Sequence, residues 1–161
     1  MANGPLVRIS IRGGDLVIID SQVYAVLIGP PEATTWFAGS ADDGTIRFTD
    51  QSGGLVLGTW TTGPGAPAVV APAAAGLAVG SWSVTRYGAR AEAGPDPTPA
   101  EQPGPIKDLT RLTSGYYAIQ EPNTGAYLYR NRIEDLSLMP KQVALQPGSP
   151  DQGPLLIQVV G

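Results

Sequence analysis

The sequence predicts an all-β fold, and three observations support this prediction. First, the chain holds 21 glycines and 16 prolines in 161 residues, and no window of a dozen residues keeps the apolar spacing of an amphipathic helix free of such breakers. Second, short runs rich in Val, Ile, Tyr, Phe and Trp recur between the breaks, often with alternating polar residues. Third, these runs fall into three similar groups. The chain length fits one domain with a buried core.

Seven segments carry the strand signal most clearly. Their β-branched and aromatic residues favour extended backbone, and their alternation turns one face toward a core. The segments are 6–11, 16–19, 23–28, 45–49, 55–60, 116–119 and 155–160. Each is bounded by glycine, proline or polar residues, which are typical of turns.

The strands repeat as three copies of a four-strand unit, at about residues 5–40, 44–87 and 115–161. Twelve strands in three copies predict a β-trefoil, which is a six-strand barrel capped by three hairpins around a pseudo-threefold axis. A β-sandwich is the alternative, because its strands also alternate. The aligned positions are Val7, Ile46 and Tyr117, then Ile9, Phe48 and Ile119, then Ile18, Leu57 and Leu128, then the strand-ending Pro30, Pro72 and Pro147, and finally Trp36, Trp82 and Ile157.

A long insertion separates the second copy from the third. Equivalent positions lie 39 residues apart between the first two copies and 71 apart between the last two. The excess falls mainly in residues 88–111, which include five prolines and few large apolar side chains. Such a composition predicts an extended surface linker within one domain.

The composition excludes several classes of function. The chain has no histidine and no cysteine, so it lacks the usual base of serine and cysteine hydrolases, the commonest metal ligand, and any disulfide. Its net charge of −4 and its lack of a basic run argue against nucleic acid as a partner. No apolar segment is long enough for a membrane span, and no signal peptide is recognisable. We therefore expect a cytoplasmic protein.

Neighbouring carboxylates occur at Asp42 and Asp43 and at Glu134 and Asp135. A glycosidase needs two carboxylates that face each other across a sugar, whereas adjacent acids on a strand point to opposite faces. Asp-Asp-Gly is also a turn composition. We therefore expect no catalytic residue, no metal and no cofactor, and no enzyme activity.

The third copy carries the motif E-D-x-S-L-x-P-K within GYYAIQEPNTGAYLYRNRIEDLSLMPKQVALQPGSPDQGPLLIQV, residues 115–159. This segment resembles the first repeat of the mushroom serine protease inhibitors of the cospin type, which are cytosolic, disulfide-free β-trefoils. The first two copies are similar to the second and third repeats of that family, but more loosely. The matching positions are Ile119, Arg130 or Arg132, Glu134, Asp135, Ser137, Leu138, Pro140 and Lys141.

The resemblance implies an unusual order of repeats. The family's second, third and first repeats follow one another here, so the proline-rich linker joins what would be the family's two termini. This order describes a circular permutant, which is tolerated where the ends lie close together at the surface. The alternative is the ordinary order with one long loop.

The resemblance also implies inhibition of a trypsin-like serine protease by a monomer. The family presents a loop between the second and third strands of its first repeat, which corresponds here to residues 129–140. A trypsin-like enzyme requires Arg or Lys at P1, and we select Arg132 first and Arg130 second, flanked by Asn131 and Ile133. The family's glycine before the arginine is absent. The alternative is that both arginines are rim residues paired with Glu134 and Asp135.

A carbohydrate-binding protein is the other candidate function, beside a permuted scaffold that has lost inhibition. The Q-x-W signature of ricin-type lectins is absent from all three copies, since Thr34-Thr35 precedes Trp36 and Gly80-Ser81 precedes Trp82. Trp60 is the best candidate for an exposed aromatic platform, although we expect it to pack as a cap residue.

Overall fold

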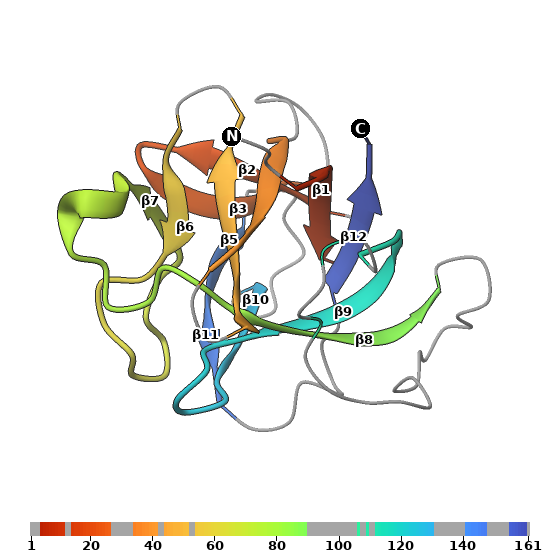
Figure 1. The fold of residues 1–161 in the computed structure, drawn as a ribbon. Coiled ribbons are helices and arrows are strands. Elements are labelled where there is room, and N and C mark those ends of the chain that lie inside the picture. The colour runs from red at the N-terminus through yellow and green to blue at the C-terminus, as the bar shows by residue number, and fades with distance from the viewer. Residues whose placement is uncertain are drawn as a thin grey trace.

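The computed structural model describes residues 4–11, 14–26, 34–41, 44–51, 54–89, 106, 109, 112–130, 141–147 and 155–160. These residues form an all-β protein, which confirms the predicted class, with one short 3-10 helix at Ala73–Ala75 (Figure 1). All seven predicted segments overlap strands. The strands are β1 (Leu6–Ile11), β2 (Gly14–Ile19), β3 (Gln22–Val26), β4 (Trp36–Ser40), β5 (Ile46–Asp50), β6 (Val56–Gly58), β7 (Val69–Ala71), β8 (Ser83–Ala89), β9 (Gly115–Gln120), β10 (Tyr127–Arg130), β11 (Lys141–Gln146) and β12 (Leu155–Val159).

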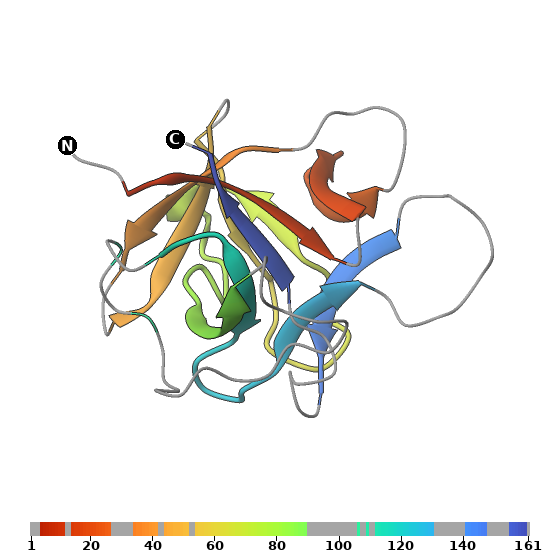
Figure 2. The ribbon, with the colours of Figure 1, turned by 90° about the vertical axis from the view of Figure 1, so that its right-hand side faces the viewer.

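Ten of the described strands are joined edge to edge in a closed antiparallel barrel (Figures 1 and 2). Their order is β10-β11-β3-β7-β6-β5-β4-β1-β12-β9. The ring is closed where β9 pairs with β10, through Gln120 and Tyr127. Two strands lie outside this ring: β8 pairs with β9, and β2 pairs with β1 and β3. Closure leaves the ten barrel strands without a free edge in the ring.

The predicted β-trefoil is therefore wrong. That architecture needs a barrel of six strands and a separate cap of three hairpins, whereas β3, β6, β7, β10 and β11 are members of the closed ladder. The described strands also form one continuous sheet, so the β-sandwich alternative is not observed either. Alternation shows which residues face a core, but pairing between distant segments decides the barrel, and alternation does not encode that pairing.

The core of the barrel contains most of the residues that the aligned strands turn inward. Aliphatic and aromatic side chains from all parts of the chain meet there in one cluster. The predicted core residues that are buried are Val7, Ile9, Trp36, Ile46, Phe48, Leu57, Trp82, Tyr117, Ile119, Leu128 and Ile157. Burial of this apolar area is the main stabilising contribution to the fold.

Strand β2 is the exception to this alignment. Ile18 is only partly buried, and Leu16 takes the buried position instead. The error is a shift of two residues, because two aliphatic residues on the same face of a strand satisfy a period of two equally well. Leu16 is therefore the residue of β2 that corresponds to Leu57 of β6 and Leu128 of β10. The three residues pair with Ala25, Val70 and Leu145 on the following strand.

The predicted linker at 88–111 begins inside a strand, since β8 continues to Ala89. Near its other end, the backbone N–H of Ile106 donates to the carbonyl oxygen of Val84 at 2.7 Å, and Ile106 and Leu109 pack against the core. The linker is thus attached to the barrel at both ends, and residues 90–105 lie outside the described part of the chain.

A search of the described residues finds no helix with the length and apolar character needed to span a membrane. The same residues contain no cluster of three or more potential His, Cys, Asp or Glu metal ligands.

Candidate functional site

The predicted protease-binding residues begin at the end of β10. Arg130 is the last residue of that strand and pairs with Val143 of β11. Asn131, Arg132 and Ile133 lie outside the described residues, as do Glu134 and Asp135, so the predicted ion pairs stay untested.

Both stems of this segment are held by neighbouring strands. β10 pairs with β11 through four consecutive residues, from Tyr127 to Arg130. On its other edge β11 pairs with β3, through Lys141–Ala25 and Gln142–Tyr24. Figure 2 shows β10 and β11 side by side at one edge of the molecule. The segment 131–140 therefore connects two strands whose register is fixed.

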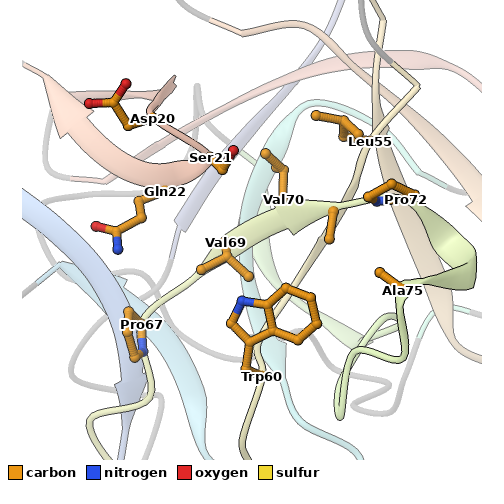
Figure 3. A pocket seen from close by; sticks show the side chains of 11 residues that line it. Asp20, Ser21, Gln22, Leu55, Trp60, Pro67, Val69, Val70, Pro72 and Ala75 are labelled. Carbon is orange, nitrogen blue, oxygen red and sulfur yellow. The ribbon is translucent and has the colours of Figure 1, made fainter.

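A second candidate site is a pocket of about 460 Å³ between the β2–β3 turn, β7 and the segment after β6. Figure 3 shows Trp60 below Val69 in this view, with Gln22 and Pro67 to its left and Leu55, Pro72 and Ala75 to its right. The lining is mostly apolar, and its polar side chains are those of Asp20, Ser21 and Gln22 together with the Trp60 indole N–H. Such a mixture is typical of small-molecule sites.

Trp60 is 53% exposed, so the expectation that it packs as a cap residue is wrong. Its backbone position is nevertheless well defined. The preceding Thr59 is buried and exchanges two backbone hydrogen bonds with Val79, at 3.0 and 3.2 Å. The Thr59 hydroxyl donates to the carbonyl oxygen of Thr61 at 2.6 Å. The chain on both sides of Trp60 is thus fixed while the indole ring faces solvent.

The rim of the pocket is formed by a tight turn between β2 and β3. Its two residues, Asp20 and Ser21, have φ values of 51° and 66°, in the left-handed region that hairpins with two-residue connections require. Neither is glycine, so each costs about 1–2 kcal/mol in this conformation. The turn is held against β7, where the backbone N–H of Val70 donates to the carbonyl oxygen of Ser21 at 2.9 Å.

Gln22 offers the pocket a hydrogen-bond donor. Its Oε1 accepts two hydrogen bonds of 3.1 Å, from the Tyr24 hydroxyl and from Nε2 of Gln142. No described residue accepts a hydrogen bond from its Nε2. The side chain is therefore oriented by its oxygen while its amide N–H groups stay available.

The sequence analysis missed Asp20, Ser21 and Gln22. A sequence signal was present, because a polar pair between two aliphatic runs is typical of a hairpin turn. Their proximity to Trp60 depends on the pairing of Gln22 with Val69, which joins β3 to β7. Local sequence does not contain that information.

No protein-family model matches the chain, and no curated protein matches it. Solved structures do match it in fold. A Caenorhabditis elegans protein of unknown function aligns with a TM-score of 0.61 and 11% identity, over 99% of this chain and 95% of that one.

Two larger proteins contain a similar unit. The Saccharomyces cerevisiae protein O-mannosyltransferase Pmt1-Pmt2 complex, bound to its sugar donor, aligns with a TM-score of 0.61 and 12% identity, over 98% of this chain and 25% of that one. The lysenin pore aligns with a TM-score of 0.57 and 11% identity, over 100% of this chain and 50% of that one. At these identities the similarity shows the fold alone.

Proposed function

We propose that this protein inhibits a trypsin-like serine protease through the segment that begins at Arg130. The supporting observation is the anchoring of the two stems. β10 is paired up to Arg130, and β11 is paired from Lys141 onward on its other edge. A binding segment between two fixed strands loses less conformational entropy when it docks, and this favours affinity.

The strand pairing distinguishes the two candidate P1 residues. Arg130 still belongs to the β10–β11 ladder, opposite Val143. A P1 residue must enter the protease cleft with its own backbone available to the enzyme, which a residue inside a ladder does less readily. Arg132 lies two positions beyond the strand. This supports Arg132 as P1, with Asn131 and Ile133 as its flanks.

The sequence motif supports the inhibitor proposal through its residues alone, because the closed ten-strand barrel is not the β-trefoil of the cospin-type inhibitors. The resemblance to cospin-type inhibitors is strongest in residues 115–159, which contain β9, β10, β11 and β12. The basic residues of the motif and the two anchored strands therefore come from the same part of the chain.

The test is a titration of trypsin activity with the parent protein and with Arg132→Ala, Arg130→Ala and Arg47→Ala. Arg47 is an exposed arginine of β5 and serves as the matched control. We expect Arg132→Ala to weaken inhibition at least thirtyfold, which is roughly the factor for a central interface residue worth about 2 kcal/mol. Arg47→Ala should inhibit like the parent.

Circular dichroism of each variant would verify that the barrel is folded. If the folded parent leaves trypsin activity unchanged, the proposed inhibition of trypsin is wrong. Loss of inhibition in Arg130→Ala but not in Arg132→Ala would assign P1 to Arg130.

A further inference from the structure

We propose that the pocket around Trp60 binds a neutral saccharide, through residues other than those of the proposed protease-binding segment. The first argument is Trp60, a residue that is 53% exposed although the other two tryptophans, Trp36 and Trp82, are fully buried. The face of an indole is apolar and electron-rich, so it packs against the C–H face of a pyranose ring. The backbone that carries Trp60 is held by the hydrogen bonds of Thr59 with Val79 and Thr61, so the point from which the indole projects is fixed before a ligand arrives.

The second argument is the set of polar groups beside the ring. Sugar hydroxyls both donate and accept hydrogen bonds, so a site needs both kinds of partner. Gln22 supplies N–H donors that no described residue uses. Asp20 supplies a carboxylate at the exposed rim, where its side chain points away from Trp60 in Figure 3. Ser21 adds a hydroxyl between them.

The third argument concerns charge and size. Asp20 is the one charged residue among the described residues that line the pocket. No described lining residue is a cation that could pair with a uronic or sialic acid, and the Asp20 carboxylate adds negative charge at the rim, so neutral sugars are favoured. The volume of about 460 Å³ lies within the range of about 300–1,000 Å³ that small-molecule sites occupy. Val69, Ala71 and Ala75 contribute small apolar side chains to the lining.

The first experiment is binding of the folded protein to an array of defined neutral and acidic mono- to tetrasaccharides. We expect binding to one or more neutral glycans and none to their sialylated or uronic counterparts. Trp60→Ala should weaken binding about tenfold or more, whereas Trp60→Phe, which keeps an aromatic face, should lose less. Gln22→Leu should weaken binding severalfold through the lost donor.

Val160→Ala is the matched control, because Val160 is the other exposed large apolar residue among those described, at 48%. It should bind glycans like the parent. A solution measurement follows Trp60 itself: acrylamide should quench this exposed indole more than the two buried ones, and the glycan found on the array should reduce that quenching. In Trp60→Phe, the glycan should no longer change the acrylamide quenching of tryptophan fluorescence.

Absence of binding to every neutral glycan on the array would overturn the proposal, as would glycan binding that Trp60→Ala leaves unchanged. Concentration-dependent self-association that Trp60→Ala abolishes, without glycan binding, would show that a second copy of the chain covers the pocket instead. The two proposals can be tested independently. Trp60→Ala should still inhibit trypsin, and Arg132→Ala should still bind glycan.

Discussion

Two buried tryptophans differ in whether the indole N–H has a hydrogen-bond acceptor. Trp36 begins β4 and Trp82 directly precedes β8, and both are fully buried in the core. The indole N–H of Trp82 donates to the carbonyl oxygen of Leu57 at 3.0 Å. The indole N–H of Trp36 has no acceptor among the described residues. A buried polar group without a partner costs about 1–3 kcal/mol.

This difference predicts unequal effects of one substitution. Trp82→Phe removes a hydrogen bond and leaves the Leu57 carbonyl without that donor, whereas Trp36→Phe removes a donor that was already unpaired. The loss of volume is the same in both, so we expect Trp82→Phe to lower the free energy of unfolding by about 1–3 kcal/mol more than Trp36→Phe. Urea unfolding of both variants provides the measurement, and equal destabilisation would contradict this explanation.

The sequence predicts individual core residues well and exposed ones poorly. Alternation correctly turns Ile9, Phe48 and Ile119 inward, because each strand has one face toward the barrel interior. Trp60 was expected to pack as a cap residue, but it is 53% exposed. Its exposure follows from the ladder between Thr59 and Val79, which local sequence does not reveal.

At the scale of elements, two strand connections are closed by a buried acid. In the β5–β6 turn, Oδ1 of Asp50 accepts from the backbone N–H of Leu55 at 2.7 Å. In the β9–β10 turn, the 1%-exposed Glu121 accepts from the backbone N–H of Asn123 at 2.8 Å and from the N–H and hydroxyl of Thr124, both at 2.6 Å. These hydrogen bonds hold the ends of paired strands together.

The Glu121 turn predicts a pH dependence of stability. Burial raises the pKa of Glu121, but the hydrogen bonds from Thr124 and Asn123 together lower it by more. The pKa of Glu121 therefore lies below its ordinary value of 4.5. The ionised carboxylate therefore stabilises the fold above about pH 4.5, and this stabilisation is lost as the pH falls through the folded-state pKa.

We expect Glu121→Gln to lower the free energy of unfolding at pH 7 and to flatten its decline below pH 4.5, measured by urea unfolding across pH. Thr124→Val, which removes one hydroxyl donor, should have a smaller effect in the same direction. An acid decline as steep in Glu121→Gln as in the parent would assign the pH dependence to other groups.

Elements could be predicted from sequence more reliably than their pairing. Glycine and proline mark the ends of the strands, and alternation identifies their buried faces. The choice between Leu16 and Ile18 failed because both lie on one face of β2 and both pair with buried residues of β3, Ala25 and Val23. The candidate residues at 130–133 were predicted from a sequence motif. The pocket residues were identified only from the structure.

At the scale of the whole molecule, the closed barrel depends on contacts between segments far apart in the chain. β3 joins β7 through one residue pair and joins β11 through two. A sequence contains no local signal for such pairs, which explains why the strands were predicted correctly and their barrel was not.

The architecture predicts that the chain tolerates a break between residues 94 and 104. The flanking attachments are β8, which ends at Ala89, and Ile106, which is bonded to Val84. A specific protease site introduced in this interval and cleaved should leave two fragments that co-elute and keep the circular dichroism of the uncut protein, because no barrel strand is interrupted. Separation or unfolding of the fragments would contradict the prediction and the linker assignment behind it.

The pairing of β1 with β12 also determines when the barrel can form during synthesis. Ser10, Ile9, Arg8 and Val7 find their partners in Leu156, Ile157, Gln158 and Val159, which are translated almost a whole chain later. Until then β1 and β9 each lack a neighbour that only β12 supplies. The edge of β1 that β12 covers therefore stays unpaired from early in translation, and that of β9 from its own synthesis, so the nascent chain should be prone to aggregation until β12 emerges.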